Sequence, residues 1–234
     1  MSEKISVALA SYNGEIFIKQ QIETILSNLR ENDELIISDD GSTDNTIQIV
    51  KQINDPRIRI IEGPGKGVIS NFENAINACT GDYIFLSDQD DIWESDKVLK
   101  VLETFHKTNC TCVLHDALVV NGEATEVVLD SFFSFRNSKA GILKNLWKNS
   151  YIGCCMAFTS SMKKYIVPIP SDMGKVFHDQ WIGLMCEKHG KSVFIQDKLI
   201  KYRRHDNNQS NMHRYSLFQM VTNRLSLIKN LIKR

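Results

Sequence analysis

Residues 5–46 read ISVALASYNGEIFIKQQIETILSNLRENDELIISDDGSTDNT, and their pattern decides the fold. Apolar and β-branched residues at 5–9 predict a strand, and apolar residues at helical spacing between 18 and 29 predict a helix. A second strand is predicted at 35–37. A strand, a helix and another strand in this order form a right-handed crossover between parallel strands. The segment therefore predicts a βαβ unit at the start of an α/β domain.

The same alternation continues as far as residue 86. A helix is predicted to follow residues 42–44, where a Ser or Thr hydroxyl would cap the free N–H groups of its first turn. A strand at 58–61, a glycine-rich turn at 63–67 and a further helix lead to a strand at 83–86. Three crossovers in a row predict a mixed, mostly parallel central sheet with helices on both faces.

The second half of the chain is less regular, and one continuous domain over residues 1–210 is the division that fits it. The halves of this domain are residues 1–118 and 119–210. The elements expected in the second half are a polar and aromatic stretch at 122–138, a short helix at 142–147, a strand at 154–158, a helix at 179–188, and two short strands at 192–196 and 199–203. Residues 211–234 are predicted to form a separate C-terminal helix.

The composition is that of a globular protein without a strong overall charge. Of 234 residues, 42% are hydrophobic and 24% are charged. The 28 basic residues balance 28 acidic ones, so no long-range field attracts nucleic acid, and we expect no nucleic-acid partner. The first residues lack the basic flank and apolar stretch of a signal peptide, which predicts a cytoplasmic protein. The six cysteines lack zinc-site spacing and are expected to be reduced and buried.

Polar clusters follow three of the predicted strands, at residues 11–14, 39–42 and 87–91. In open α/β sheets, ligands bind at the carboxyl ends of the strands, so these clusters mark the expected site. Asp88 and Asp90 stand two residues apart in an extended turn and suit a divalent cation, or they cap the following helix. Together with Asp39 and Asp40 they would repel one another unless a cation or a donor-rich ligand entered.

These clusters resemble the motifs of a known family, the family 2 nucleotide-sugar glycosyltransferases, which have the GT-A fold. The matching segments are residues 7–13, 39–46, 81–84 and 87–91. In the second half, residues 178–181 (HDQW) and 202–208 (YRRHDNN) resemble the bacterial rhamnosyltransferase-like branch of the family. Asp206 stands where that branch usually has a glycine. The resemblance implies that residues 1–118 bind the nucleotide sugar and residues 119–210 the acceptor.

The resemblance implies a nucleotide pocket at the ends of the first two strands. Ala10, Tyr12 and Asn13 would line the space for the base and the ribose. Asp40, supported by Asp39, would accept a hydrogen bond from the N3–H of uracil or thymine. A carboxylate suits this imide N–H because charged acceptors make the stronger hydrogen bonds.

The diphosphate and a metal ion are expected beside the third cluster. Asp88 would face the ribose, and Asp90 would hold Mn²⁺ or Mg²⁺ on the diphosphate, whose charge a cation neutralises. His205 would complete the metal shell or remain a surface residue. Lys66 would add a positive charge unless it is a solvated loop lysine. Arg203 and Arg204 offer another use of the late loop, as contacts to the diphosphate.

Asp179 is implied to be the general base that takes the proton of the acceptor hydroxyl in an inverting transfer. The alternative is a first-turn acid that interacts only with the helix dipole. His178 and Trp181 would contact the acceptor or the donor sugar, although an indole at this place is equally suited to core packing.

The C-terminal segment is amphipathic and basic. Apolar residues at helical spacing are Leu217, Val221, Leu225, Ile228 and Ile232, and Arg224, Lys229 and Lys233 stand between them. The helix would either cover the sheet or lie on an anionic bilayer at the inner face of the cell membrane.

The function implied is that of an inverting, metal-dependent glycosyltransferase in cell-surface polysaccharide synthesis. A UDP- or dTDP-sugar would be the donor, and a glycan or lipid-linked glycan the acceptor. Rhamnose from dTDP-rhamnose is the first expectation, and a UDP-hexose such as UDP-galactose or UDP-glucose is the alternative. An inactive nucleotide-sugar-binding scaffold subunit is an alternative of another class, against which the presence of Asp90 and Asp179 argues.

Overall fold

The computed structural model describes residues 3–173, 176, 178–205, 208 and 217–234. The first half alternates strands and helices as predicted. Its elements are β1 (Ile5–Ser11), α1 (Ile18–Leu26), β2 (Glu34–Asp39), α2 (Thr46–Ile53), β3 (Ile58–Glu62), α3 (Val68–Ala78) and β4 (Tyr83–Ser87). Strand β1 pairs in parallel with both β2 and β4, and β2 pairs in parallel with β3. The predicted crossovers are confirmed.

The second half extends the sheet with shorter and partly antiparallel strands. Its elements are β5 (Ile92–Trp93), α4 (Lys97–Thr108), β6 (Cys112–Asn121), β7 (Val127–Leu129), α5 (Phe132–Arg136), α6 (Ile142–Trp147), the 3₁₀ turns Gly153–Cys155 and Ser160–Met162, β8 (Met156–Thr159), α7 (Lys163–Ile166), α8 (His178–His189), β9 (Ser192–Arg204) and α9 (Leu217–Lys233). Within the described residues, one sheet has the order β3-β2-β1-β4-β8-β6-β9-β5, and β7 pairs with β6.

Two local predictions are wrong. The final pair of short strands is one strand, β9, whose pairing with β6 passes from Ile195 to Lys198 across a bulge. The sequence shows this bulge as a polar gap, which looks like a break between strands. The cap expected for α2 is also different, because the Ser42 hydroxyl donates to Asp39 instead. The Asp44 carboxylate accepts the Thr46 N–H in its place (3.0 Å).

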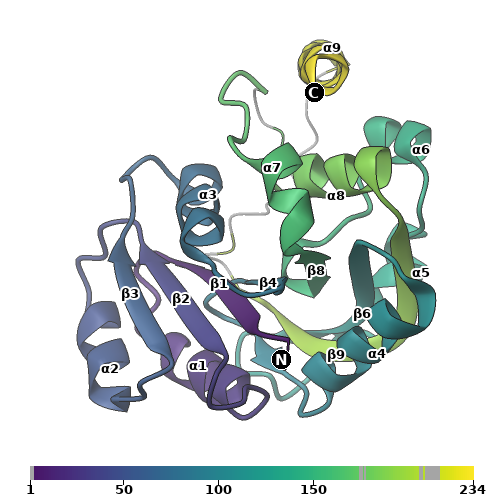
Figure 1. The fold of residues 1–234 in the computed structure, drawn as a ribbon. Coiled ribbons are helices and arrows are strands. Elements are labelled where there is room, and N and C mark those ends of the chain that lie inside the picture. Colours follow the sequence, from purple (N-terminus) through teal and green to yellow (C-terminus); the bar gives the residue numbers. More distant parts are fainter. Residues whose placement is uncertain (1–2, 174–175, 177, 206–207, 209–216) are drawn as a thin grey trace.

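Helices cover both faces of the sheet (Figure 1). Beside strands β1, β2 and β3, α1 and α2 lie on one side and α3 on the other. The strands between them are apolar and buried, and Ile5, Val7 and Leu9 of β1 are fully enclosed. All six cysteines fall in the described part of the chain, and each is buried with a free thiol, as predicted. A rigid, buried sheet of this kind fixes the position of the loops at its carboxyl edge.

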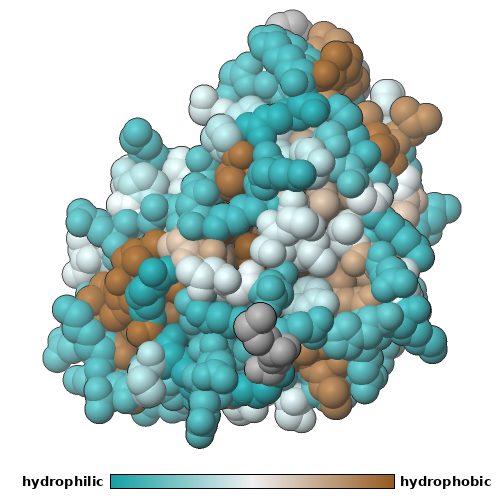
Figure 2. Space-filling view, in the orientation of Figure 1, coloured by the Kyte–Doolittle hydropathy of each residue, from teal (hydrophilic) through white to brown (hydrophobic). Residues whose placement is uncertain are grey.

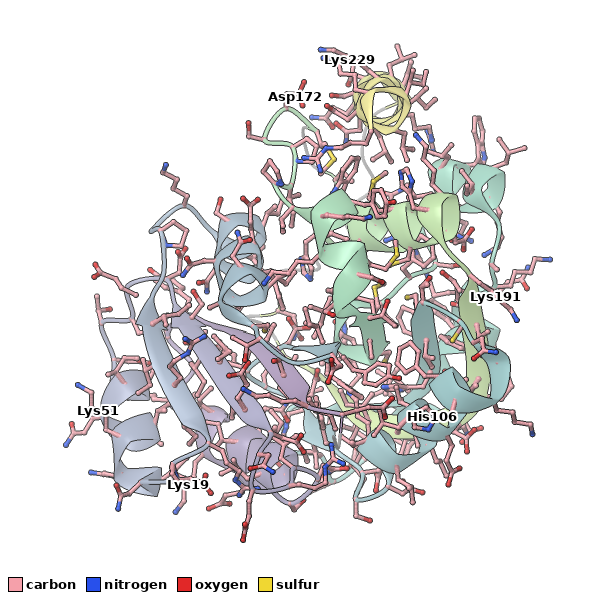
Figure 3. The ribbon with its side chains drawn as sticks, viewed as in Figure 1. Lys19, Lys51, His106, Asp172, Lys191 and Lys229 are labelled. Carbon is pink, nitrogen blue, oxygen red and sulfur yellow. The ribbon has the colours of Figure 1, made fainter. Side chains whose placement is uncertain are left out.

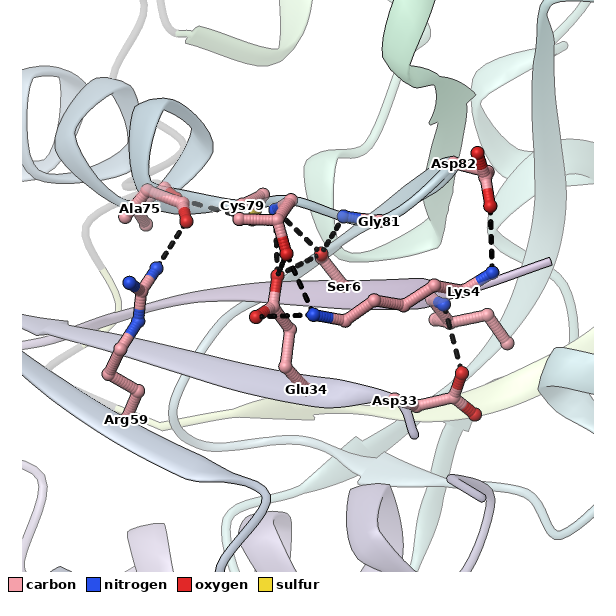
Figure 4. Close-up of polar contacts among 12 residues, drawn as sticks. Lys4, Ser6, Asp33, Glu34, Arg59, Ala75, Cys79, Gly81 and Asp82 are labelled. Atoms are coloured by element: carbon pink, nitrogen blue, oxygen red, sulfur yellow. Dashed lines mark hydrogen bonds and ion pairs between the residues drawn. The ribbon is translucent and has the colours of Figure 1, made fainter. Parts of the chain in front are cut away.

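The opposite edge of the sheet is held by a polar network around Glu34 (Figure 4). Its carboxylate accepts hydrogen bonds from the Ser6 hydroxyl (2.5 Å), the Thr80 N–H (2.7 Å) and the Lys4 ammonium (3.0 Å). Burial alone would raise the pKa of Glu34, but these hydrogen bonds outweigh it and lower the pKa to about 2. The network ties β1, β2 and the start of β4 together.

A pH dependence of stability follows from this network. Because the pKa of Glu34 is lower in the folded protein, its carboxylate stabilises the fold above pH 4.5, its ordinary pKa, and loses this effect as the pH falls toward 2. Glu34→Gln is expected to lower the urea midpoint at pH 7 and to leave it nearly unchanged near pH 2. Urea unfolding of both proteins across this range is the measurement. An equal difference at both pH values would contradict the role of the charge.

Helix α9 packs on the second half of the molecule rather than on the sheet (Figure 1). Leu227 and Leu231, on the inner face of α9, are buried. The amide of Asn230 on the same helix donates to the Asp172 carboxylate (2.7 Å). Figure 3 shows Asp172 next to Lys229, with which it forms an ion pair of 3.5 Å. The prediction that this helix covers the sheet is wrong. Residues 211–216, which were expected to belong to the helix, lie outside the described residues.

The apolar stripe read from the sequence lies on the outer face of α9. Its described members, Val221, Leu225, Ile228 and Ile232, are exposed by between 38% and 78%. Figure 2 shows apolar residues in brown around α9 at the top of the molecule. Among the described residues, no helix combines the length and apolar character needed to cross a bilayer.

Candidate active site

A pocket of about 840 Å³ opens at the carboxyl edge of the sheet. Its walls come from the loops after β1, β2 and β4, the glycine-rich turn before α3, the 3₁₀ turn at Gly153, the first turn of α8 and the segment after β9. The pocket therefore collects residues from both halves of the chain. This is the place where parallel α/β sheets bind ligands.

The loop after β1 brings Ala10, Tyr12 and Asn13 to the pocket, as expected. Tyr12 is half-exposed there. Asn13 has a φ of 47°, in the left-handed region that Asn tolerates. Its backbone N–H donates to the Ser42 hydroxyl (2.8 Å), and its side-chain oxygen accepts the Thr43 N–H (2.8 Å). These bonds join the loops that follow β1 and β2 into one wall.

Asp39 and Asp40 have different environments. Asp39 is buried and accepts from the hydroxyls of Ser11 (2.9 Å) and Ser42 (2.6 Å), so it supports the loop and does not line the pocket. Asp40 lines the pocket, and its two carboxylate oxygens accept the N–H groups of Gly65 and Gly67, each at 2.7 Å. Asp40 thus holds the glycine-rich turn at the wall of the pocket.

The glycine-rich turn presents its backbone, not its lysine, to the pocket. Gly65 and Gly67 have φ values of 65° and 89°, which glycine adopts without a steric penalty. Lys66 between them is exposed and does not line the pocket, so the prediction that it adds charge to the site is wrong here. Asn71, which the sequence analysis did not single out, anchors the next helix by donating to the Ser38 carbonyl (2.8 Å).

Asp88 and Asp90 face the pocket from the loop after β4. They do not cap a helix, because β5 lies between them and α4. Burial, and then the charges of Asp90 and Asp179, raise the pKa of Asp88 to about 7. The Asp90 carboxylate contacts His205 Nε2 (2.9 Å) and Asn208 Nδ2 (3.2 Å). The late loop therefore reaches back to the acidic cluster, as the motif at residues 202–208 suggested.

This donor set fits a hard divalent cation at the pocket. Carboxylate oxygens and an imidazole nitrogen, here Asp88, Asp90 and His205, are ligands that Mn²⁺ accepts. After burial, the charges of Asp90 and Asp179 are the causes that raise the pKa of Asp88, and a cation would offset this shared negative charge. Among the described residues, the possible ligands whose atoms all lie within 4.8 Å of one another are a different set, Asp88, Asp91 and Cys154. Cys154 and Asp91 are fully buried, and a thiol is a poor ligand for Mn²⁺ or Mg²⁺. Asp88, Asp90 and His205, which line the pocket, therefore fit such a cation better.

The arginine alternative for the diphosphate is wrong for Arg203. Its side chain is buried and donates to the Gly122 carbonyl (2.7 Å) and to Gln20. Its backbone N–H donates to Asp91 (3.1 Å). Arg203 therefore fixes the end of β9. Arg204 does not line the pocket. Asp206 of the same motif lies outside the described residues.

Asp179 lies in the first turn of α8 and faces the pocket. Its carboxylate accepts the Gln180 N–H (2.6 Å) and the Asn149 amide (3.3 Å). Burial raises the pKa of Asp179 to about 6, and these two hydrogen bonds oppose the shift. The group is therefore an oriented carboxylate that is mostly ionised at neutral pH and still basic enough to take a proton.

His178 also lines the pocket, with its ring stacked on Phe72 at 4.0 Å between centroids. It is 7% exposed, and neither ring nitrogen has a hydrogen-bond partner among the described residues. Trp181 does not reach the pocket. It is fully buried, and its indole N–H donates to the Ile166 carbonyl (2.8 Å), so the prediction that it contacts a sugar is wrong.

Three further residues shape the site and were missed as site residues. Asn208 belongs to the motif at residues 202–208, and this motif could have identified it as a site residue. Asn149 orients Asp179 from the loop after α6. Gly153 allows the His178 ring to approach the backbone closely, because a Cβ at this position would lie 2.8 Å from His178 Nε2. Asn149 and Gly153 are distant in sequence from the motifs and carry no local signal.

The chain is similar in sequence to known proteins. The family model for glycosyl transferase family 2 matches residues 6–167. The dTDP-rhamnosyl transferase RfbG of Shigella flexneri is 28% identical over 95% of this chain and 79% of its own length. An uncharacterised glycosyltransferase of Nostoc sp. is 24% identical over 88% of this chain, which spans 66% of that protein.

Solved structures share the fold. TarS from S. aureus in complex with UDP-GlcNAc has a TM-score of 0.71 at 17% identity, over 91% of this chain and 62% of that chain. The mannosyltransferase PcManGT from Pyrobaculum calidifontis, in complex with GDP-Man and Mn²⁺, has a TM-score of 0.65 at 16% identity, over 88% and 59% of the two chains. The chain thus spans about 60% of these solved chains. The family match, the fold and the motifs together show that this chain belongs to glycosyltransferase family 2 and has the GT-A fold.

Proposed function

We propose that this chain is an inverting, metal-dependent glycosyltransferase. It takes a sugar from a UDP or dTDP donor and transfers it to a glycan or lipid-linked glycan in cell-surface polysaccharide synthesis. One observation carries the proposal: Asp179, an oriented carboxylate with a raised pKa, shares one pocket with the Asp88–Asp90 cluster. Residues 1–118 then bind the nucleotide sugar, and residues 119–210 bind the acceptor.

In the proposed reaction, Asp90 and Asp179 have different roles. Asp90, with His205 and Asp88 beside it, would hold a divalent cation, which would supply positive charge for the leaving diphosphate. Asn149 and the Gln180 N–H hold the Asp179 carboxylate toward the pocket. Asp179 accepts the proton of the acceptor hydroxyl as that oxygen attacks the sugar. Attack from the face opposite the diphosphate inverts the anomeric carbon.

Asp40 is proposed to recognise the base. Asp40→Ala is expected to weaken UDP and dTDP binding by about 1 to 3 kcal/mol, the cost of a lost hydrogen bond to a charged group. A purine diphosphate, which lacks the pyrimidine imide, should bind as poorly as before. Calorimetric titration of UDP, dTDP and GDP against both proteins is the measurement. An unchanged pyrimidine preference would restrict Asp40 to its observed role, which is to hold Gly65 and Gly67.

The sugar is proposed to be rhamnose from dTDP-rhamnose, with UDP-glucose or UDP-galactose as the second candidate. The first is supported by the likeness to RfbG and the HDQW segment. The second is supported by a glucosyltransferase of Escherichia coli, WfgD, that is named for UDP-Glc and is 28% identical over 64% of this chain. A panel of dTDP-rhamnose, UDP-glucose, UDP-galactose and UDP-N-acetylglucosamine, assayed for transfer or hydrolysis, tests the choice. Consumption of none, with UDP still bound, would favour the inactive scaffold.

The outer face of α9 is proposed to contact an anionic bilayer, which would bring the enzyme to a lipid-linked acceptor. Leu225→Asp with Ile232→Asp is expected to abolish sedimentation with vesicles that contain phosphatidylglycerol, because both side chains are exposed on the apolar stripe. Thr222→Asp is the matched control, since it places a charge on the same helix away from the stripe. Vesicle binding that is equal in all three proteins would contradict the proposal.

A further inference from the structure

We propose that the donor sugar of this enzyme is uncharged and that a ring nitrogen of His178 holds one of its hydroxyl groups. The inference rests on the proposed function, because it concerns the sugar that lies between the diphosphate and Asp179. It excludes the uronic acids, which carry a carboxylate on the ring and form a large class of donor sugars.

The charged side chains that line the pocket are mainly acidic. Four carboxylates line it, those of Asp40, Asp88, Asp90 and Asp179, and no lysine or arginine is among its described lining residues. A nucleoside diphosphate already brings negative charge, which the bound cation offsets. A uronate would add a further negative charge next to Asp179, with no described partner to balance it. Repulsion between like charges in such a site strongly disfavours the binding of a uronate donor.

Two cations near the pocket, Lys97 and Arg136, make other contacts. The Lys97 ammonium is buried, donates to the Cys154 carbonyl (2.8 Å) and lies over the Trp93 ring. Arg136 acts on Asp179 through its charge, but its guanidinium donates to the Asn149 carbonyl (2.6 Å) and it does not line the pocket. Each would have to give up a formed contact in order to pair with a sugar carboxylate.

His178 is a buried polar group in the pocket wall whose ring nitrogens are available to bind a ligand. A side chain that is more than nine-tenths buried rarely leaves both ring nitrogens without a partner. The stack on Phe72 fixes the ring, and the next residue is the proposed base. A neutral imidazole donates one hydrogen bond and accepts another, which matches a hydroxyl. Burial lowers the pKa of His178 to about 3, so the ring offers no positive charge to a uronate.

Gly153 lets the His178 ring lie close to the backbone of the 3₁₀ turn. A Cβ on residue 153 would lie 2.8 Å from His178 Nε2 and 3.5 Å from the Asp179 Cβ. Because 2.8 Å is too short for an unbonded carbon and nitrogen, a methyl group at this position would displace the ring on which the proposed contact to the sugar depends.

The test uses pairs of donors that differ only in the oxidation state of C6. UDP-glucose is compared with UDP-glucuronate, and UDP-galactose with UDP-galacturonate, in competition with UDP in the presence of Mn²⁺. Each uronate donor is expected to bind about tenfold or more weakly than its neutral partner. A uronate donor that binds as tightly as its partner would overturn the inference. Failure of UDP itself to bind would overturn the proposed function, so the two failures are distinct.

A second arm tests His178. His178→Ala, and His178→Asn in case the alanine variant does not fold, are expected to raise the KM for the best neutral donor about tenfold or more. The Kd for UDP should not change, since UDP lacks the sugar. Gly153→Ala should give the same pattern, because its Cβ would displace the His178 ring. A folded His178 variant with the parental KM would overturn the assignment of this residue, as would an equal loss of UDP affinity, because a general structural role weakens both.

Discussion

Asp179→Asn is expected to lower the single-turnover rate of sugar transfer by about 10² to 10⁴, the usual contribution of a positioned proton acceptor. Asparagine keeps the size of the side chain and can still accept from the Asn149 amide. It cannot take the proton of the acceptor hydroxyl. The affinities for UDP and for Mn²⁺ should be unchanged, and so should the melting temperature within a few degrees.

The pH profile gives an independent measure of the same group. Because the pKa of Asp179 is raised to about 6, the unprotonated base is lost below that pH, and the transfer rate should fall tenfold per unit there. The Asn variant should lack this limb. Asp130→Asn is the matched control, since it removes an exposed carboxylate that pairs with Lys198. A variant that melts early yet transfers at the parental rate would limit Asp179 to stabilising α8 through the helix dipole.

Asp90→Ala is expected to abolish the effect of a divalent cation on nucleotide binding. In the parent protein, Mn²⁺ should strengthen UDP binding by about 100-fold or more, because without it the diphosphate meets Asp88, Asp90 and Asp179 with like charge. In the variant, the UDP affinity with Mn²⁺ should equal the parental affinity in EDTA. Calorimetry with and without the cation makes the comparison.

Two further variants sharpen this result. His205→Ala should weaken the effect of Mn²⁺ without removing it, because Asp90 and Asp88 remain. Asp82→Asn, at the other end of β4 and bonded to the Lys4 N–H, should change nothing and serves as the matched control. Equal UDP affinity in Mn²⁺ and in EDTA for the parent protein would contradict the proposed metal site.

The first half of the fold was predictable because local and long-range requirements agree there. Each buried parallel strand is a short apolar run, each helix has one apolar face, and each strand ends in a polar loop. The carboxyl edge of the sheet then brings Asp40, Asp88 and Asp90 together, whatever the length of the crossovers. The late residues Asp179 and His205 could be placed in the same site only through the family resemblance.

Other features could not be predicted because tertiary packing decides them. Helical spacing shows that α9 has an apolar stripe, but not whether Leu225 or Leu227 faces the protein, and the buried residue is Leu227. Trp181 follows Asp179 by two positions, and only the packing of α8 turns it toward Ile166 and away from the pocket. Lys66 is next to two residues that line the pocket, but its side chain is exposed and does not line the pocket itself.

The central claim is that this pocket transfers a sugar with inversion and that Asp179 is the base. Proton NMR of the sugar released from an α-linked UDP donor, followed from the first turnovers with water as the acceptor, tests it directly. The account predicts that the β anomer forms first, before mutarotation, and that Asp179→Asn loses this signal. Initial release of the α anomer would contradict it, because retention does not use a base on the face opposite the diphosphate.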